Sequence, residues 1–347
     1  MAIDVTGGLS QDWEFVWAAQ PEDHEMRESV NAWIWDNSGT FGAPRIGIEA
    51  AADQWDTHDI QVNLAFADGR TFYIYGPGAV HDPIGSDGRP RILGAGPLSF
   101  ELIEPYGHLE MRIDGEAVAT TVHEQMTGFL PGMGSGERTR IRAELDIRPI
   151  VPPWQNGSMS EEAHRVLTTQ EEGWLVGIPW RFEQLCRVTG TIAVGDEVHK
   201  LDGGANRIRR QGVRRLASFW GHSWQAAIFD DGRAFGYQTF PPRKDGKATY
   251  NEGYLFLGDG DLVPARVVKA PFMNTLQANG EDVSLVLETA DGTHEIRGET
   301  LTSTFMVMPP EVGGGMQLQQ AVTRYSWDGV GGMGMTERSS TPDVLGS

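Results

Sequence analysis

Residues 140–147 read Arg140-Ile-Arg-Ala-Glu-Leu-Asp-Ile147, in which apolar and charged side chains alternate without a break. Successive side chains of a β-strand point to opposite faces, so Ile141, Ala143, Leu145 and Ile147 would share one face and the charges the other. This stretch predicts a strand with one buried face and one solvated face, which is typical of antiparallel sheets.

Asp-Gly dipeptides punctuate the same kind of alternation along the whole chain, where they occur nine times. Between apolar segments this dipeptide signals a β-hairpin, because the turn requires a positive φ. We therefore expect hairpins at Asp68-Gly69 and at Asp114-Gly115. The strands predicted around these and later turns cover 60–66, 71–75, 108–113, 117–122, 187–192, 225–229, 234–238, 283–287, 294–297 and 317–325, with a last strand starting near 331.

Helical signals are weak, so the predicted fold class is all-β with few short helices. One helix is expected over 160–167, where Ser160 is a suitable N-cap and two acidic residues follow it. It comes directly after the stiff segment Val151-Pro-Pro-Trp154, and we place the boundary between two β domains in this region. The predicted division is an N-terminal domain over 1–160, a C-terminal domain over 161–338 and a flexible tail over 339–347.

The length of the chain agrees with this division, since 347 residues suffice for two domains of roughly 150 residues each. The two halves also share the pattern Phe-x-Asp-Gly-Arg-x-Phe, at 66–72 and at 229–235. Such a match arises either from an internal duplication or from repeated use of Asp-Gly hairpins, and the sequence leaves both open.

The charge balance excludes several classes of partner. Lys and Arg total 28 and Asp and Glu total 48, which gives a net charge of −20. So acidic a surface repels phosphate backbones and anionic lipids, and we expect neither nucleic-acid nor membrane binding. No stretch approaches the ~20 apolar residues that cross a bilayer, and the N-terminus has no secretory signal, so the expected compartment is the cytoplasm. The single cysteine, Cys186, excludes an intrachain disulfide.

Nucleotide and metal motifs are missing from the sequence. There is no G-x-x-x-x-G-K-[ST], no G-x-G-x-x-G that opens a helix, and no G-x-S-x-G nucleophile elbow. His123-Glu124 lacks the second histidine of a zinc-binding H-E-x-x-H. We therefore expect no cofactor and no metal.

Aromatic residues are more informative, because the chain has 11 tryptophans. In a β protein most of these fill cores, and the others can line an apolar ligand cavity. Trp33 and Trp35 share one face of a predicted strand, as a core anchor or as a stacking wall for a flat ligand. On the next strand Arg45 and Glu49 share a polar face, which either points into a cavity or forms a solvated pair.

One basic cluster stands out in this acidic chain, over residues 207–215, where Arg207 and Arg214 are among five arginines. It either pairs with acidic groups of the same chain, which is the favoured reading, or binds an anionic partner. His222 and Trp224 follow closely, and a histidine has an intrinsic pKa suited to proton transfer near neutral pH. From the residues alone, a structural role for His222 is somewhat favoured over a catalytic one.

Taken together, these residues resemble the hydroxyneurosporene synthase-like (carotenoid hydratase-like) superfamily. The resemblance runs as short patches from about residue 28 to residue 337, and their order and spacing carry it. The patches in the first half are Glu28-Ser-Val-Asn-Ala-Trp-Ile-Trp35, Arg45-Ile-Gly-Ile48 and Phe66-Ala-Asp-Gly-Arg70. Those in the second half are Phe182-Glu-Gln184, Arg187-Val-Thr-Gly-Thr-Ile192, Asp202-Gly203, Arg207, Gly212-Val-Arg214, His222-Ser-Trp224, Phe229-Asp-Asp-Gly232 and Gly332-Met-Gly-Met-Thr-Glu337.

The resemblance implies two lipocalin-like antiparallel β-barrels or sandwiches packed side by side, with the ligand in a barrel mouth or between the barrels. It also implies cofactor-free hydration, dehydration, isomerisation or cyclisation of large apolar molecules. One stretch departs from the family. Where relatives often carry Arg-Asp-His-Ser-Trp-Gly, this chain reads Arg207-Ile-Arg-Arg-Gln-Gly212, and the nearby His222-Ser-Trp224 is a candidate substitute.

The leading hypothesis is a cofactor-independent lyase, hydratase or isomerase acting on a bulky aromatic or terpenoid small molecule. His222 is the predicted general acid or base, Glu49 the second carboxyl with a pKa raised by burial, and Arg45 a group that holds a substrate oxygen. Tyr73 or Tyr75 would donate a hydrogen bond to a developing oxyanion. The residues predicted to bind the substrate are Trp33, Trp35, Trp224, Arg207, Arg214 and Tyr237.

The alternative is a non-catalytic lipocalin-like carrier of the same apolar ligands. Two or more titratable groups that face one cavity would favour catalysis, and a purely apolar lining would favour carriage. A third class is an interaction module without a pocket of at least ~300 Å³. Exposed strand edges leave a homodimer possible.

Overall fold

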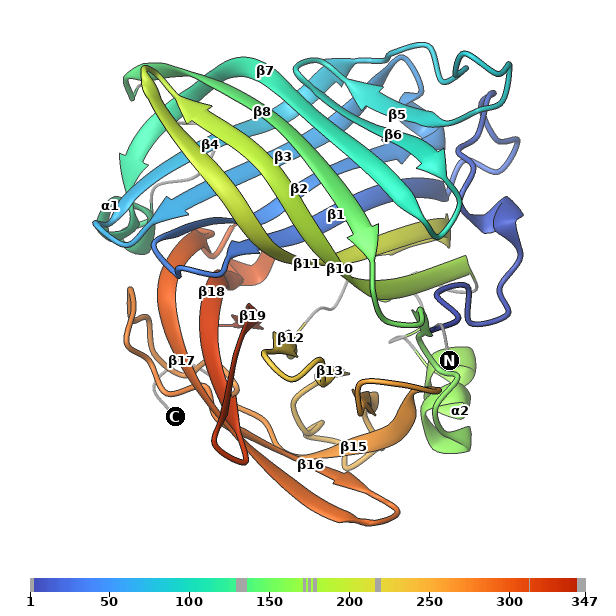
Figure 1. Cartoon of the computed structure of the whole chain (residues 1–347), viewed down its shortest axis with the longest axis vertical. Helices are drawn as coiled ribbons and strands as arrows, with labels where there is room; N and C mark the ends of the chain where they lie inside the picture. The colour runs from blue at the N-terminus through green and yellow to red at the C-terminus, as the bar shows by residue number, and fades with distance from the viewer. Residues whose placement is uncertain are drawn as a thin grey trace.

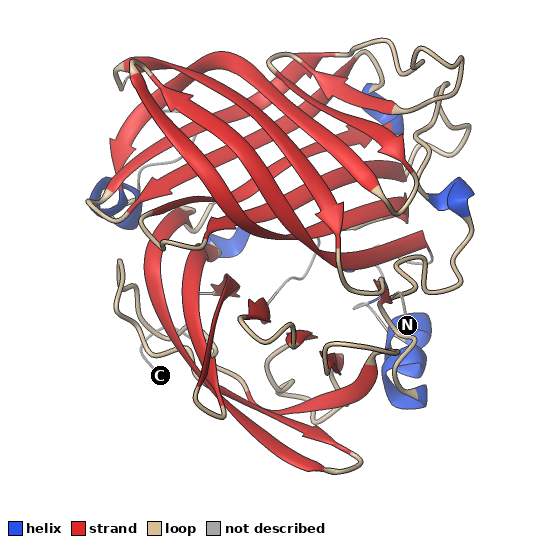
Figure 2. Ribbon diagram, viewed as in Figure 1, coloured by secondary structure: helices blue, strands red, loops and turns tan. Residues whose placement is uncertain are grey.

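Nearly every regular element of the chain is a β-strand, as predicted (Figure 2). The computed structural model describes residues 3–128, 136–170, 173, 176, 180–215, 220–311 and 313–341. The strands before residue 215 are β1 (Met26–Asp36), β2 (Phe41–Ala51), β3 (Thr57–Phe66), β4 (Arg70–Ala79), β5 (Ile92–Ala95), β6 (Leu98–Glu104), β7 (His108–Thr121), β8 (Arg138–Pro149), β9 (Trp154–Gln155), β10 (Trp180–Val194) and β11 (Glu197–Val213). The later strands are β12 (Gly221–Phe229), β13 (Ala234–Thr239), β14 (Asn251–Phe256), β15 (Val263–Lys269), β16 (Leu285–Thr289), β17 (Gly292–Val307), β18 (Gln317–Trp327) and β19 (Val330–Ser340).

Helices are short within the described residues. They are α1 (Val122–Met126), α2 (Glu161–Thr169) and the 3₁₀ turns η1 (Gln11–Trp13), η2 (Ala52–Gln54) and η3 (Gly313–Gly315). The helix predicted over 160–167 is confirmed as α2, and its N-cap is the side chain of Ser160, which accepts the backbone N–H of Ala163 at 3.1 Å.

Antiparallel pairing organises the strands into two bodies that pack against each other (Figure 1). The first sheet runs β4-β3-β2-β1-β11-β10-β8-β7-β6-β5, and β4 also pairs with β7, so that the strands from β7 back to β4 form a ring. The second body is a closed barrel of β12 to β19 in chain order. The prediction of two antiparallel β units side by side is therefore confirmed.

The two sheets divide the chain at a different place from the predicted boundary at residue 160. Figure 1 shows β10 and β11 inserted between β8 and β1 of the first body. Both strands had been assigned to the second unit, over 161–338. Without them β1 and β8 would present open edges, which explains why the chain returns to the first ring after α2. The proline segment before α2 marks this excursion, and the change of sheet falls between Val213 and Gly221.

The Asp-Gly signal was correct at some turns and wrong at others. The β3–β4 hairpin turns at Asp68-Gly69 as predicted, with Gly69 at a φ of 90°. The hairpin predicted at Asp114-Gly115 does not exist, because β7 runs straight through it and pairs both residues with β8. At Gly115 an added Cβ would lie 2.5 Å from Pro97, so this glycine serves close packing and not a turn.

The repeated Phe-x-Asp-Gly-Arg-x-Phe pattern forms the same structure twice, in the β3–β4 hairpin and in the β12–β13 hairpin. In each turn the arginine donates from Nε to the aspartate, over 2.8 Å from Arg70 to Asp68 and over 2.7 Å from Arg233 to Asp231. Both readings of the repeat, duplication and reuse of a stable hairpin, are compatible with this geometry.

The predicted flexible tail over 339–347 begins too early. Ser339 and Ser340 belong to β19, where they are buried and pair with His222 and Gly221 of β12. Residues 342–347 lie outside the described residues, so the rest of that prediction is not tested.

Alternation along the strands sorts side chains into three packed regions. On β1, Val30 and Ile34 lie in the core of the first body, whereas Trp33 and Trp35 lie in a cluster with Trp154 and Trp224 that joins the two bodies. A third cluster fills the second barrel. The outward-facing tryptophans of β1 are therefore buried, because the second barrel packs against that part of the first body.

Candidate functional site

A polar cavity of about 60 Å³ lies between the two bodies. The first body contributes Asn31, Trp33, Arg45, Arg181, Ile208, Arg210 and Arg214, and the second barrel contributes His222, Trp224, Gln238, Phe240 and Glu337. Five of these residues were predicted from the sequence: Trp33, Arg45, Arg214, His222 and Trp224. The structure brings them together from β1, β2, β12 and the end of β11.

His222 and Glu337 form the titratable pair of the cavity. They lie on the adjacent strands β12 and β19, and both side chains are buried. Nε2 of His222 lies 3.1 Å from Oε1 of Glu337, and Nδ1 lies 2.6 Å from Oγ of Ser339. The hydroxyl of Ser339 can donate to Nδ1 or accept from it, so the imidazole can gain or lose a proton without losing either contact.

Glu337 is held as a carboxylate by its surroundings. Burial alone would raise the pKa of this carboxyl, but the hydrogen bond and charge of His222, the charge of Arg45 and the amide of Gln320 lower it to about 2. Oε2 accepts from Nε1 of Trp33 at 2.8 Å and from Nε2 of Gln320 at 2.6 Å. The cavity therefore holds a negative oxygen next to a histidine.

The lowered pKa predicts how stability depends on pH. The Glu337 pKa falls from its usual 4.5 to about 2, so the stabilisation is fully present above about pH 4.5 and is lost as the pH falls toward 2. A shift of this size corresponds to about 3 kcal/mol. Between about pH 4.5 and pH 2, the wild-type protein should lose about this much unfolding free energy through Glu337. Glu337→Gln should lack this part of the loss, as measured by urea titrations at each pH. Equal pH dependence in both proteins would contradict this prediction.

Two tryptophans form an aromatic wall beside this pair. The rings of Trp33 and Trp224 meet edge to face, with centroids 4.3 Å apart. Nε1 of Trp224 donates to Glu183 at 2.8 Å, and Glu183 also accepts from Arg181 at 2.6 Å. Because both indole N–H groups bind carboxylates, the orientation of the ring faces is fixed before any ligand arrives.

The face of β2 that carries Arg45 and Glu49 points toward the second barrel and away from the interior of its own barrel. The face is largely covered although it points away from its own barrel, so Arg45 lines the polar cavity and Glu49 pairs with arginines, and the two do not form a solvated pair. Glu49 accepts from Arg27 at 2.7 Å, from Arg210 at 2.6 Å and from Arg214 at 3.1 Å.

These contacts overturn the prediction that Glu49 is a carboxyl with a raised pKa. Burial raises the pKa of Glu49, but the charges of Arg210, Arg214 and Arg27 outweigh it and hold the pKa well below the usual value of 4.5. Glu49 thus fixes arginines of the cavity wall, and Glu337 is the carboxyl beside His222.

Several other predicted site residues lie elsewhere. Tyr73 is buried but does not line the cavity, and Tyr75 is half exposed on β4, with 49% of its surface accessible. Trp35 packs at a second cavity of about 450 Å³ near Gly203 and Gly204. Their positions follow from strand alternation, which a sequence without known register does not determine.

Arg207 and Tyr237 fill the interiors of the two barrels. Arg207 donates to Glu14 at 2.6 and 3.0 Å and to Gln184 at 2.6 Å. Tyr237 bonds to Ser223 at 2.8 Å and donates to Gln225 at 2.7 Å. Neither residue lines the cavity between the bodies, so their predicted contact with substrate there is not supported.

The stretch that departs from the family, residues 207–212, is part of β11. Along it Arg207 and Arg209 point into the first body, whereas Ile208 and Arg210 line the cavity. The favoured reading of the basic cluster as intramolecular pairing agrees with these contacts, since Arg209 donates to Glu28 at 2.5 Å. The candidate substitutes His222 and Trp224 do line the cavity.

Ser339, His222 and Glu337 are connected like the nucleophile, base and acid of a hydrolase. The backbone N–H of His222 also donates to Oγ of Ser339, at 3.1 Å. Ser339 is 1% exposed and is not part of the cavity lining. Its hydroxyl is therefore placed to hold the histidine and not to attack a substrate.

A much larger open cleft of about 1090 Å³ is lined in part by residues next in sequence to those of the polar cavity: Trp180 precedes Arg181, and 211–213 lie between Arg210 and Arg214. Trp17, Met26, Leu167, Trp180 and Val213 give it a mainly apolar lining, and Arg243 and Lys247 stand at its edge. Aromatic contacts link the two spaces: the ring of His222 lies 6.5 Å from Phe240, which lies 5.3 Å from Trp220, and Arg243 lies over Trp220 at 5.0 Å.

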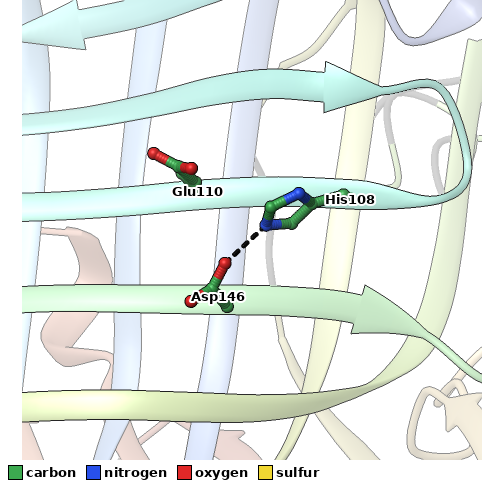
Figure 3. Close-up of side chains that lie close together, drawn as sticks. All are labelled: His108, Glu110 and Asp146. Carbon is green, nitrogen blue, oxygen red and sulfur yellow. Dashed lines mark hydrogen bonds and ion pairs between the residues drawn. The ribbon is translucent and has the colours of Figure 1, made fainter.

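One group on the outside of the first body has the residue types of a metal site. His108, Glu110 and Asp146 lie on neighbouring strands, β7 and β8, with their ligand atoms within 4.8 Å of one another (Figure 3). His108 bonds to Asp146 at 2.6 Å and Arg112 donates to Glu110 at 2.7 Å, so these groups already have partners. None of these three residues lines the polar cavity, and we assign the cluster no role.

Cys186 is also unsuited to chemistry. It is fully buried in the first body, and burial, the largest influence, raises the pKa of its thiol to about 12. The interpretation of Cys186 as a small buried apolar residue is confirmed.

Sequence reasoning missed Glu337, Arg181, Arg210, Asn31, Gln238 and Phe240 as parts of this site. The one available signal was the closing Gly332-Met-Gly-Met-Thr-Glu337, which pointed to a last strand but not to a partner for His222. These two residues are 115 positions apart, and only the pairing of β12 with β19 brings them together.

Comparison with known proteins places this geometry in context. Residues 14–342 match the model of a family described as "Domain of unknown function (DUF7064)". No curated protein matches the chain. None of the described helices has the length and apolar character needed to cross a membrane.

Solved structures share the fold over almost the whole chain. A putative AttH from Nitrosomonas europaea has a TM-score of 0.54 at 16% identity, covering 90% of this chain and 91% of its own. CghA with Sch210972 has 0.54 at 11%, covering 92% and 89%. Kievitone hydratase from Nectria haematococca has 0.50 at 11%, covering 99% and 98%. These matches show that the chain shares its two-barrel fold with those proteins.

Proposed function

We propose that this chain, which belongs to the DUF7064 family, adds water to a bulky, partly apolar small molecule, or removes it, between its two barrels. The observation that carries the proposal is the buried His222–Glu337 pair, which lines a cavity beside two tryptophans. Among the fold neighbours, one is named a hydratase and another is a complex with a small molecule.

The cavity of about 60 Å³ admits the reacting end of a substrate and not its whole body. The adjoining apolar cleft of about 1090 Å³ has the volume for an aromatic or terpenoid skeleton. We therefore place the skeleton in the cleft, between Trp17 and Trp180, and the reacting carbon near Glu337. Burial of the skeleton excludes bulk water from the reaction.

Removal of water breaks a C–H bond and a C–O bond and forms a C=C bond. Oε1 of Glu337 takes the proton from carbon, and Nε2 of His222, which lies 3.1 Å away, is the proton donor of the pair. The hydroxyl leaves with a second proton as water, and His222 can supply that proton. Hydration follows the same steps in reverse and needs no group beyond these side chains and water.

Two alternatives from the sequence are less well supported. A carrier needs no facing acid and base, whereas this cavity holds His222, Glu337 and several arginines. An interaction module needs no pocket above ~300 Å³, and the cleft exceeds that volume.

The proposal is tested by incubating the purified protein, without added cofactor, with a panel of terpenoid, polyphenol and aromatic-dimer compounds. We expect at least one product whose mass differs from its substrate by one water. Native mass spectrometry of the same mixtures records binding. If ligands bind tightly but every one is recovered unaltered, the hydratase hypothesis is rejected and the carrier hypothesis is favoured.

A further inference from the structure

The wall of the polar cavity carries four arginines in a chain whose net charge is −20. Arg181 is paired with Glu183 at 2.6 Å. Arg210 and Arg214 share the single carboxylate of Glu49, to which Arg27 also donates. Among the described residues, these four arginines and Arg27 face the carboxylates of Glu49, Glu183 and Glu337, so five guanidinium groups against three carboxylates keep a positive excess.

Arg45, the fourth arginine, makes no direct ion pair with a carboxylate among the residues that the structure describes, although its charge acts on Glu337 in the same cavity. Its hydrogen-bond partner is Oδ1 of Asn31, at a long 3.5 Å, and its guanidinium carbon lies 5.3 Å from the centre of the Trp33 ring. Its Nε is buried and makes no hydrogen bond in the described structure. Such a donor, left unsatisfied at a cavity wall, calls for an acceptor from outside the chain.

The crowding of these charges supports the same conclusion. Burial, the largest influence, and the charge of Arg214 hold the pKa of Arg210 well below its usual value, despite Glu49. Burial also lowers the pKa of Arg214, and the charges of Arg45 and Arg181 lower it further. An anion between these groups would relieve their mutual repulsion.

We propose that the cavity binds a carboxylate group of the ligand on Arg45, supported by Arg210 and Arg214, so that the substrate is an aromatic or terpenoid acid. The guanidinium fork suits a planar carboxylate, and a group of that size fits the cavity. The apolar remainder lies in the neighbouring cleft. This inference rests on the proposed function only in calling the ligand a substrate. The binding of the ligand can be measured without any reaction.

The test uses two probes of the same shape, 2-naphthoate and 2-naphthamide, which differ in charge. Isothermal titration calorimetry on the full chain is expected to show naphthoate binding at least about 10-fold tighter than naphthamide. Arg45→Gln should remove most of this preference by weakening naphthoate binding much more than naphthamide binding, and Arg45→Lys should restore part of it. Arg142→Gln changes an exposed arginine of β8 and serves as the control, with the preference retained.

Equal affinity for the two probes, or an unchanged preference in Arg45→Gln, would overturn the inference. If Arg45→Gln fails to fold, Arg214→Gln answers the same question, and a wild-type preference that is insensitive to salt would also count against an ionic contact. Failure here leaves the hydration assay intact, whereas charge-selective binding without any turnover would reject the proposed reaction and retain the anion site.

Discussion

Replacement of His222 by alanine is expected to lower turnover at least about 100-fold for any compound that the wild-type protein hydrates or dehydrates. The imidazole holds the proton that the pair exchanges, at 3.1 Å from Glu337. Without it Oε1 of Glu337 loses its partner, Oε2 keeps those of Trp33 and Gln320, and the reaction loses its proton donor. The measurement is kcat by product formation under substrate saturation.

Matched variants separate chemistry from folding in that experiment. Glu337→Gln should lower kcat to a similar extent, because an amide cannot take up the proton. His164→Ala changes an exposed histidine on α2 and should leave kcat unaltered. Wild-type near-ultraviolet circular dichroism in each variant excludes misfolding. An unchanged rate in His222→Ala would remove His222 from the mechanism.

The largest expected effect on stability is that of Arg207→Met, at about 3–5 kcal/mol. Arg207 and Glu14 are both buried in the first body and form two hydrogen bonds, at 2.6 and 3.0 Å. Removal of the arginine leaves a buried carboxylate without its counter-charge. Urea denaturation reports the change as a lower midpoint at constant slope.

A substitution at an exposed arginine and a double substitution serve as controls for this measurement. Arg187 is exposed and pairs with the exposed Asp202 at 3.1 Å, so Arg187→Met should change stability by less than about 1 kcal/mol. Combining Arg207→Met with Glu14→Leu should recover much of the loss, because no unpaired charge is left. A loss in Arg207→Met no larger than in Arg187→Met would contradict a structural role for this pair.

The local structure of this chain could be predicted from its sequence. Strand alternation over 140–147 gave β8, and Asp68-Gly69 gave the β3–β4 turn, because both depend on neighbouring residues only. The turn predicted at Asp114-Gly115 was wrong because Gly115 packs closely against Pro97, which is distant in the sequence. The prediction that placed β10 and β11 in the second unit was wrong for the same reason, because their pairing with β1 and β8 depends on strands that are distant in the sequence.

The candidate site could be predicted in part. Trp33, Arg45, Arg214, His222 and Trp224 were chosen as candidates because each is a residue type suited to a ligand site, and all five line one cavity. Their common cavity depends on two barrel surfaces that meet, and no local pattern reports such a contact. For this reason Glu49 was predicted as the carboxyl that acts with His222, whereas the carboxyl that lies beside His222 is Glu337.

The most direct test of a reaction site between the barrels is a crystal structure of His222→Gln with a compound that the wild-type protein hydrates. A slow variant should trap the substrate with its reacting carbon next to Glu337 and its skeleton in the cleft beside Trp180. Substrate density inside either barrel, or at the outer face of β7 and β8, would contradict the account.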